Sequence, residues 1–330
     1  MFMNDQQVIW SDLSVFYAAP FTQDFLSHHY SQKLNKADAE KKSFENCYPF
    51  IYYLEHSKNY YKLAEQAPLS IQPMLLFYGI SQLLKACLLV KDSQYPANTS
   101  ILAHGVSTRK RKKQDYKFLD DEVKIQKSGL FPHIDQTLFN LGVLEHEKYS
   151  MKELLIQIPE THQLFKHLYR REVSHVFGSI HDDRWVFSDL AFDYYKMSER
   201  RFHEYFYSHL RPQLIDIDML AEREINPRLL KKEALLHCAP FSYSLEEDVY
   251  CFPFIKPLSR MLPEILVHYL LLYNLSMISR YETEWWYELL HSYSSKDYPF
   301  IVKFLEVTKI KSPFLLKNFL LSYTKKADLL

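Results

Sequence analysis

The chain has 330 residues, and its 40 Lys and Arg side chains balance its 40 Asp and Glu side chains, so the formal net charge is zero. Hydrophobic residues make up 47% and charged residues 24%, which excludes disorder as the main state. Only five glycines occur, at positions 79, 105, 129, 142 and 178. Their spacing excludes the glycine-rich loops of dinucleotide-binding and Walker A sites, which need two or more glycines within about seven residues.

The N-terminus and the most apolar segment predict a chain that stays out of membranes. Met1–Trp10 lacks the apolar core of a signal peptide. Leu262–Ser279 contains Glu264, His268 and Asn274, whereas a spanning helix needs about 20 residues almost free of such groups. The four cysteines form no C-x-x-C pair and predict buried thiols rather than a disulfide framework. We therefore expect a cytoplasmic protein.

The first strong helix signals come early in the chain. Ser43–Gln66 alternates aromatic pairs with charges, and Pro49 is expected to interrupt this helix. Pro68–Val90 gives the strongest signal, because Ser70 can cap it and Pro73 fits the first turn. Apolar residues cover most of its circumference, which predicts a buried, central helix.

The middle of the chain predicts a mixture of helices and short strands. A loop is expected around Pro96, before the mixed region begins. Helical periodicity returns in Glu147–Val176, with a break at Pro159. Extended or alternating patterns, which are typical of strands, occur in Tyr116–Phe131, Ile180–Phe192 and Phe241–Ile255.

The C-terminal part predicts four further helices, three of which begin at a proline: Pro263–Tyr281, Glu284–Tyr293, Pro299–Val307 and Pro313–Tyr323. The whole pattern favours a mainly α, multi-helix globular fold with a small β insertion in the middle of the chain. No linker divides it. We therefore expect a single domain over residues 1–330, with a helical sub-region at 1–100, a mixed α/β insertion at 101–260 and C-terminal helices at 261–330.

Three stretches together carry a family resemblance. They are Pro73–Ala86, then His104–Lys113 continuing to Asp120–Phe131, and Leu275–Trp286. These stretches resemble the YaaC-like proteins of Bacillus and its relatives, and the likeness covers nearly the whole chain. The resemblance implies a shared fold, but it implies no reaction and no ligand.

A second likeness concerns Gln82–Leu88, which is similar to the buried helix of HEPN domains, where a Lys-Ala pair follows a polar residue. HEPN ribonucleases also carry an Arg and a His with four to six residues between them, and Arg170 and His175 have four. The resemblance implies a HEPN-like helical core and metal-independent RNA cleavage at a dimer interface, with His175 as acid or base and Arg170 on the scissile phosphate. However, Arg171 stands where those enzymes carry a small polar residue, and such pairs also recur by chance.

Five consecutive cations form the strongest charge feature of the sequence: Arg109, Lys110, Arg111, Lys112 and Lys113. Tyr116 and Phe118 follow this basic run and could offer stacking faces, a pattern that suits single-stranded nucleic acid. The partner predicted for such an arm is RNA or another polyanion. The alternative is a solvated loop that nearby carboxylates partly neutralise.

Arg280 and Trp285 flank the junction between two predicted helices. In one interpretation they form a pocket wall, with Arg280 as an anion clamp and Trp285 as a lid. In the other, which we favour, Arg280 is structural and is held by a carboxylate or by backbone carbonyls, while the tryptophan packs between helices.

The sequence predicts neither a metal site nor a cofactor site. His203 and His209 are six residues apart, which misses the i, i+4 geometry of zinc-protease helices. His181-Asp182-Asp183 could hold a hard cation, but a single doublet of this kind is common by chance.

Two functional hypotheses from different classes follow. The first is a non-catalytic binding or regulatory protein whose basic arm contacts RNA, a nucleotide or an acidic protein surface. The second is a HEPN-like ribonuclease that uses Arg170 and His175. The sequence leaves open whether the protein is an enzyme and whether it forms a homodimer.

Overall fold

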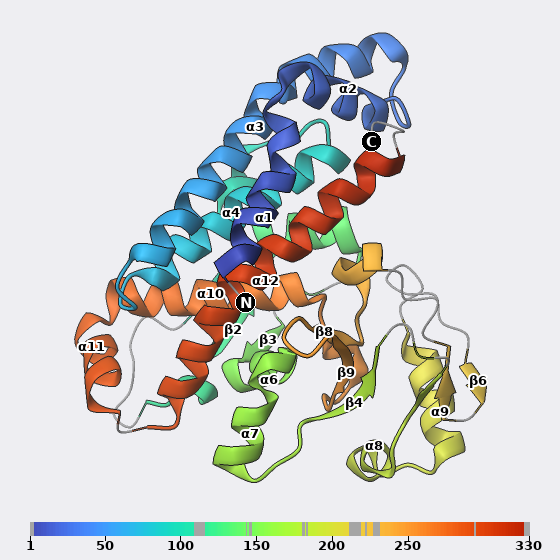
Figure 1. Cartoon of the computed structure of the whole chain (residues 1–330), viewed down its shortest axis with the longest axis vertical. Helices are drawn as coiled ribbons and strands as arrows, with labels where there is room; N and C mark the ends of the chain where they lie inside the picture. Colours follow the sequence, from blue (N-terminus) through green and yellow to red (C-terminus); the bar gives the residue numbers. More distant parts are fainter. Residues whose placement is uncertain are drawn as a thin grey trace.

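The computed structural model describes residues 3–108, 116–142, 144, 147–179, 182, 184–210, 219–221, 223–226, 232–293 and 295–326. The molecule is elongated, and its N-terminal helices run beside its last helix (Figure 1). The long helices that build this part are α1 (Met3–Asp12), α2 (Ala19–Tyr30), α3 (Lys36–Gln66), α4 (Gln72–Lys91), α10 (Glu264–Tyr281), α11 (Thr283–Ser292) and α12 (Asp297–Lys326).

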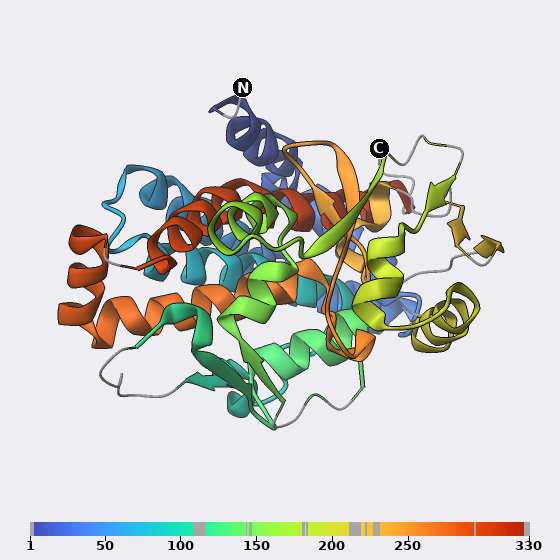
Figure 2. The same cartoon turned by 90° about the horizontal axis from the view of Figure 1, so that it is seen from below.

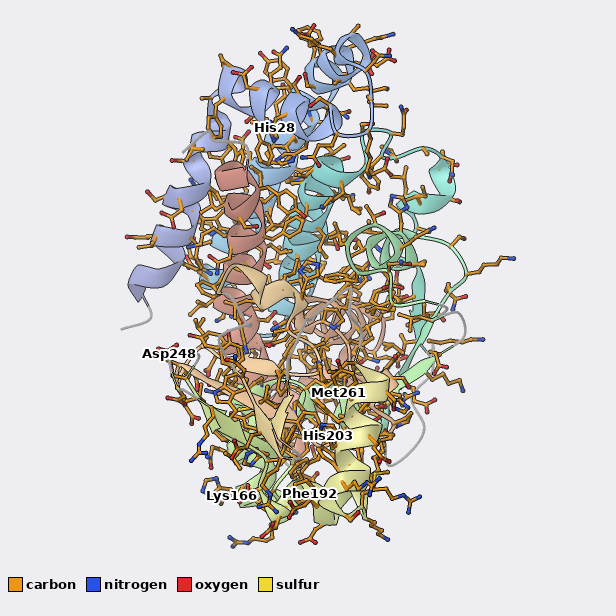
Figure 3. All side chains as sticks on the ribbon, turned by 90° about the vertical axis from the view of Figure 1, so that its right-hand side faces the viewer. His28, Lys166, Phe192, His203, Asp248 and Met261 are labelled. Atoms are coloured by element: carbon orange, nitrogen blue, oxygen red, sulfur yellow. The ribbon has the colours of Figure 1, made fainter. Side chains whose placement is uncertain are left out.

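Shorter helices and small sheets occupy the other end. His28 on α2 lies at one end of the molecule, and Lys166 and Phe192 lie at the opposite end (Figure 3). The shorter helices at this end are α6 (Met151–Ile156), α7 (His162–Tyr169), α8 (Asp189–Tyr195) and α9 (Glu199–His209), whereas α5 (Leu130–Ile134) lies beside the C-terminal end of α4, where His133 contacts Asp92 at 3.0 Å.

The described strands form antiparallel sheets of three strands each. One contains, in order, β1 (Val106–Thr108), β2 (Glu122–Ile125) and β3 (Lys148–Ser150). A second contains β4 (Ser174–Gly178), β9 (Val249–Pro253) and β8 (Ser242–Ser244). The third contains β5 (Trp185–Val186), β7 (Glu224–Ile225) and β6 (Met219–Ala221). The prediction of a mainly α fold with a small β region in the middle of the chain is therefore confirmed.

Helix α4 lies at the centre of the helical part, packed against α3, α10 and α12. Gly79 permits the close approach of α3, because a Cβ atom there would lie 2.9 Å from Cε2 of Tyr61. Ser57 on α3 donates a hydrogen bond to the Gly79 carbonyl oxygen at 2.8 Å. The central helix is thus as predicted, but it begins at Gln72 and Ser70 does not cap it.

By length and composition, α4 is the one helix among the described residues that could span a membrane, and 72% of its most apolar window is buried within the structure. The core helix of a globular protein passes the same test. Helix α10 is also buried on all sides, and its polar residues Glu264, His268 and Asn274 are buried with it. Leu262–Ser279 therefore belongs to the core, as predicted.

Two prolines lie inside long helices that the sequence predicts to be broken. Helix α3 continues through Pro49, and α12 continues through Pro313, so the two predicted C-terminal helices are one. Each proline removes only one backbone donor, and packing on both sides keeps the helix continuous. At Pro313 the carbonyl left without a donor is that of Lys309, and the side-chain amide of Gln6 on α1 donates to it at 2.9 Å.

The mixed region differs from the sequence prediction in its details. Glu147–Val176, predicted as helical, begins with β3 and ends in β4, and only the part around α6 and α7 is helical. Ile180–Phe192 contains the two-residue strand β5 and then enters α8. Short apolar runs with aromatic residues suit both a strand and a buried helix, so periodicity does not separate them. The predicted strands in Phe241–Ile255 are confirmed as β8 and β9.

A backbone crossing between Gly105 and Gly129 fixes the loop that precedes β1. Both residues have positive φ angles, of 76° and 127°, and a Cβ atom on Gly129 would lie 2.4 Å from the Gly105 backbone. Only glycine fits such a contact. The backbone N–H groups of Leu130 and Phe131 then bond the carbonyls of Ala103 and His104 at 2.7 and 3.1 Å. This crossing holds His104 against the helical core.

Candidate functional site

Arg280 lies in the last turn of α10, where its guanidinium contacts uncharged groups. Its Nε donates to the Ser276 carbonyl oxygen at 3.0 Å, and its Nη1 lies 3.4 Å from the hydroxyl oxygen of Tyr78 on α4. The guanidinium carbon is 5.3 Å from the ring centre of Tyr281. In the described part of the chain, no carboxylate lies within 4.0 Å of it. Of the two kinds of partner expected for a structural Arg280, only a backbone carbonyl is present.

Lys85 is a second half-buried cation, and it projects from α4. Its ammonium lies 5.6 Å from the ring centre of Tyr53 on α3. Burial lowers the pKa of Lys85, and none of the described carboxylates lies within 4.0 Å of the ammonium. Partial burial of an ammonium without a counter-ion is unfavourable, so an anion that reached Lys85 would be bound favourably.

His104 lies near both cations. Its ring packs edge-on against Phe77 and Tyr273, with ring centres 5.0 and 5.7 Å away, and its backbone carbonyl accepts a hydrogen bond from Tyr269 at 2.9 Å. Burial lowers the pKa of His104, and the charges of Arg280 and Lys85 lower it further. None of the described residues hydrogen-bonds its ring nitrogens. At neutral pH the imidazole is therefore uncharged, with one donor and one acceptor unused.

We call this group the cationic corner: Lys85, His104 and Arg280, with Tyr53 and Tyr78. Each of its side chains can donate at least one hydrogen bond, and two of its members carry positive charge. The aromatic surface extends outward, because Tyr60 stacks on Tyr78 with ring centres 5.7 Å apart. Such a combination of cations and half-buried rings suits a phosphate group next to a planar base.

Trp285 lies on α11, past the turn that follows Arg280. It is half-buried, and its ring packs edge-on against Tyr116 with ring centres 4.5 Å apart. The Tyr116 hydroxyl donates to Asp121 at 2.7 Å, and Asn274 of α10 donates to the same carboxylate at 2.9 Å. Trp285 therefore packs between α11 and the segment that contains Tyr116, as the favoured interpretation of the sequence expects. The ring that Arg280 contacts is that of Tyr281, not that of Trp285.

The basic run Arg109–Lys113 lies outside the described residues. The residues on either side of residues 109–115 are described, and both are fixed near α10. Thr108 ends β1 and accepts a hydrogen bond from Asn274 at 3.2 Å, while Tyr116 packs on Trp285. The chain thus leaves and re-enters the described structure close to the α10–α11 junction.

Arg170 and His175 do not share a helix. Helix α7 ends at Tyr169, Arg170 follows with a left-handed φ of 52°, and His175 lies in β4. Both ring nitrogens of His175 have partners, since Nε2 donates to the Val186 carbonyl at 2.9 Å and Nδ1 accepts from the Ser188 hydroxyl at 2.9 Å. Burial lowers the pKa of His175. The ribonuclease hypothesis stays a prediction, and it would require His175 to exchange these partners for a substrate.

A comparison with family models decides the family of the chain. The model of the YaaC-like protein family matches residues 14–320. The chain belongs to the YaaC-like family. No curated protein and no solved structure matches it. Every member of the cationic corner lies within the matched region of this YaaC-like protein, whereas α1 precedes that region. The likeness to HEPN domains stays a prediction.

Among the described residues of this YaaC-like protein, no group of three or more His, Cys, Asp or Glu side chains is placed to hold a metal ion. His181 and Asp183, which belong to the doublet noted in the sequence, lie outside those residues. The described cysteines are buried, and burial raises the pKa of each thiol.

Sequence reasoning identifies Arg280 but misses its neighbours Lys85 and His104. Lys85 is noted only for its likeness to a HEPN helix, and His104 only as part of a family stretch. The two positions are far from residue 280 in sequence, and they reach it only through the packing of α4 on α10 and the Gly105–Gly129 crossing. No periodicity or spacing signals such a contact.

Proposed function

We propose that this YaaC-like protein is a non-catalytic binding protein that holds single-stranded RNA at the cationic corner. The observation that supports it best is the partial burial of Lys85 and Arg280 beside His104 without a carboxylate partner in the described structure. A phosphate would supply the missing counter-charge, and it would accept hydrogen bonds from both cations. Among anionic partners, RNA is favoured over an acidic protein surface because aromatic rings surround the cations.

The basic run Arg109–Lys113 extends this proposal. The two described residues that flank its segment, Thr108 and Tyr116, are attached near the α10–α11 junction. Five like charges in that segment would contact phosphates of a strand whose other nucleotides occupy the cationic corner. A cytoplasmic location suits this role and stays a prediction.

The proposal is tested by fluorescence anisotropy with a fluorescein-labelled single-stranded RNA. We expect the double variant Lys85→Gln/Arg280→Gln to bind about tenfold or more weakly, because it removes two charge-assisted contacts. The matched control is Lys36→Gln/Arg201→Gln, which removes the same two charges from exposed positions on α3 and α9. Equal weakening by both pairs would show a non-specific charge effect and would contradict the site.

The basic run is tested separately through the salt dependence of the same binding. Changing Arg109, Arg111 and Lys113 to Ser should reduce the slope of log K against log salt by up to about 2, because each lost contact with single-stranded nucleic acid contributes about 0.7. The free energy of unfolding should change by less than about 0.5 kcal/mol, as for exposed charges elsewhere. An unchanged slope would show that the basic run does not contact the RNA.

The non-catalytic part of the proposal has its own test. The wild-type protein is incubated with mixed RNAs and EDTA, beside His175→Ala and His104→Ala. We expect intact RNA in every sample. Cleavage that His175→Ala abolishes would support the HEPN-like ribonuclease instead, and cleavage that His104→Ala abolishes would make the cationic corner catalytic.

A further inference from the structure

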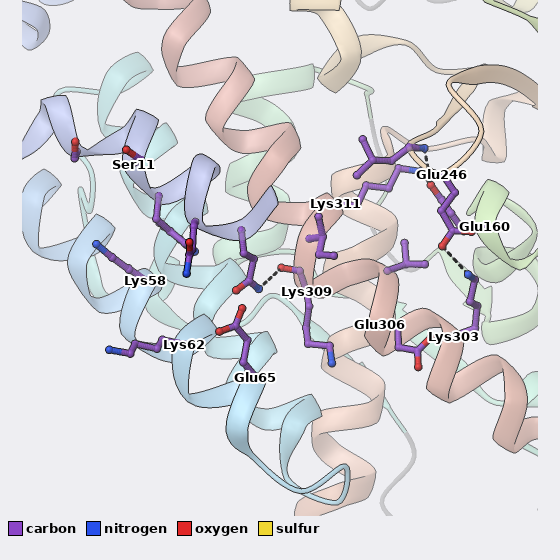
Figure 4. A pocket seen from close by; sticks show the side chains of 17 residues that line it. Ser11, Lys58, Lys62, Glu65, Glu160, Glu246, Lys303, Glu306, Lys309 and Lys311 are labelled. Atoms are coloured by element: carbon purple, nitrogen blue, oxygen red, sulfur yellow. Dashed lines mark hydrogen bonds and ion pairs between the residues drawn. The ribbon is translucent and has the colours of Figure 1, made fainter. Parts of the chain in front are cut away.

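A large cavity lies away from the cationic corner, on the side of the molecule that α1 covers. Its volume is about 1090 Å³. Helix α1 lines one side, α3 and α12 line the others, and the turn between β8 and β9 closes the end with Leu245 and Glu246 (Figure 4). Helix α1 lies at the edge of the molecule (Figure 2). Ligand cavities in proteins measure about 300–1,000 Å³, so this one is large enough for an organic molecule rather than a single ion.

A network of fully buried charges forms the floor of the cavity. The Lys311 ammonium lies 2.8 Å from Glu160 Oε2 and 2.5 Å from Glu264 Oε1, and all three side chains are at most 3% exposed. The second oxygen of Glu160 accepts a hydrogen bond from the Leu245 backbone at 2.8 Å. An ammonium has three donors, and these carboxylates use two of them. Lys311 and Glu160 both line the cavity.

The walls present cations without carboxylate partners, although the Lys58 ammonium lies 5.7 Å from the ring centre of Tyr17. Lys58 and Lys62 lie one turn apart on α3, and Lys309 projects from α12 (Figure 4). For none of these three does the described structure contain a carboxylate within 4.0 Å, whereas Lys303 on the same wall pairs with Glu246 at 2.6 Å. Two lining carboxylates, Glu65 and Glu306, likewise have no cation within 4.0 Å in the described structure. The unpaired charges are therefore three positive and two negative.

The cavity also has an apolar surface. Trp10 comes from α1, and Val307 and Ile310 come from α12 between the lysines. Trp10 packs against Tyr61 with ring centres 5.6 Å apart, which fixes its indole at the cavity wall. An apolar strip framed by ammonium groups binds a molecule that has an apolar body and a negatively charged end.

We propose that the cavity beneath α1 is a binding site for a small amphipathic organic anion, with its acidic group between Lys58, Lys62 and Lys309 and its apolar body against Trp10 and Ile310. The acidic group is a carboxylate, phosphate or sulfonate, because each accepts several hydrogen bonds from ammonium groups. This site is independent of the proposed RNA site, since the two share no residue, although both include side chains of α3.

The experiment uses 8-anilinonaphthalene-1-sulfonate, whose fluorescence rises in apolar surroundings, as the anionic probe. We expect saturable binding at one site per chain. The triple variant Lys58→Gln/Lys62→Gln/Lys309→Gln should bind the probe at least about tenfold more weakly, because it removes all three unpaired ammonium groups. The matched control Lys36→Gln/Lys41→Gln/Lys127→Gln removes three exposed charges outside the cavity and should bind as the wild type does. The uncharged analogue 1-anilinonaphthalene should bind more weakly to the wild type.

Two further measurements make the result decisive. Ser11→Trp adds bulk at an exposed position on the cavity wall and should also weaken binding, so it tests the site even if the triple variant unfolds. Circular dichroism identifies any variant that has unfolded. The proposal is overturned if the folded triple variant or Ser11→Trp binds the probe as the wild type does, or if binding does not saturate. It is also overturned if Lys85→Gln/Arg280→Gln abolishes probe binding, because the probe would then occupy the cationic corner.

Discussion

The cavity floor and the cationic corner both contain buried or half-buried lysines, but within the described structure only the floor supplies them with carboxylate partners. At the floor, Lys311 is fully buried and two carboxylates compensate its charge. Burial alone would lower the pKa of Lys311, but Glu160 and Glu264 raise it above the ordinary value. At the corner, Lys85 is only half-buried, its pKa is lowered by burial, and no described carboxylate lies within 4.0 Å.

The histidines of the two regions also differ in whether their ring nitrogens have hydrogen-bond partners. His162, beside the floor, donates from Nε2 to the Ile156 carbonyl at 2.8 Å and accepts at Nδ1 from the Ser174 hydroxyl at 2.7 Å. His104, at the corner, has no hydrogen-bond partner for its ring among the described residues. The difference suggests a way to separate structural from functional charge in this protein: groups that the fold satisfies hold it together, and the half-buried groups of the corner that it leaves unsatisfied are those we propose to bind a ligand.

The largest expected effect comes from breaking the floor. Lys311→Met leaves the carboxylates of Glu160 and Glu264 buried without a counter-charge, and such a loss costs about 3–5 kcal/mol of unfolding free energy. Lys85→Met is the matched change at the corner, and we expect less than about 1 kcal/mol there, because no partner loses its counter-charge. Urea unfolding of both variants gives the comparison. An equal loss of unfolding free energy in the two variants would show that Lys85 contributes as much to stability as Lys311, and would contradict the comparison.

A smaller effect follows from the pKa of His162, which burial lowers from 6.5 to about 4. In the unfolded chain, His162 therefore binds a proton near pH 6.5, whereas in the folded protein it stays neutral until about pH 4. The stability that this histidine contributes is complete well above pH 6.5 and decreases as the pH falls towards 4, by about 3 kcal/mol.

The measurement compares the unfolding free energy of the wild type with that of His162→Gln at pH 7.5 and at pH 4.5. Glutamine does not titrate, so the variant should lose less stability on acidification than the wild type. A difference of opposite sign would mean that the folded protein holds His162 in its charged form.

The smallest expected effect is that of Arg280→Lys on stability. The only backbone partner of the guanidinium in the described structure is the Ser276 carbonyl, so the lost hydrogen bond is worth about 0.5–1.5 kcal/mol. A shift of the melting temperature by a few degrees at most, together with weakened RNA binding, would place Arg280 with the ligand-binding groups. A loss comparable to that of Lys311→Met would make it a structural arginine, which is the interpretation that the sequence favours.

The fold could be predicted where the amino-acid pattern is local. All-round apolarity identified α4 as a core helix, the polar residues within a long apolar run identified α10 as another, and alternation identified β8 and β9. The failures also have local causes. Pro49 and Pro313 predict helix ends, yet tertiary packing keeps both helices continuous.

The candidate sites were much less predictable. Arg280 and Trp285 were visible in the sequence because a cation and an indole flank a helix junction. Lys85, His104 and the Lys311 network were not, because their partners come from distant segments; Lys311 and Glu160, for example, are 151 positions apart. A lysine in a helix looks alike in sequence whether it faces solvent or two buried carboxylates.

A proline inside a helix is normally regarded only as destabilising, because it removes a backbone hydrogen bond. A regular helix has no free acceptor along its length, because each interior carbonyl is used by the residue four positions later. Pro313 leaves the Lys309 carbonyl without that donor, and Gln6 attaches α1 there. The unpaired carbonyl of α12 is thus one point of attachment for the N-terminal helix, and so for one wall of the cavity. Moving the proline by one turn would move this point by about 5.4 Å.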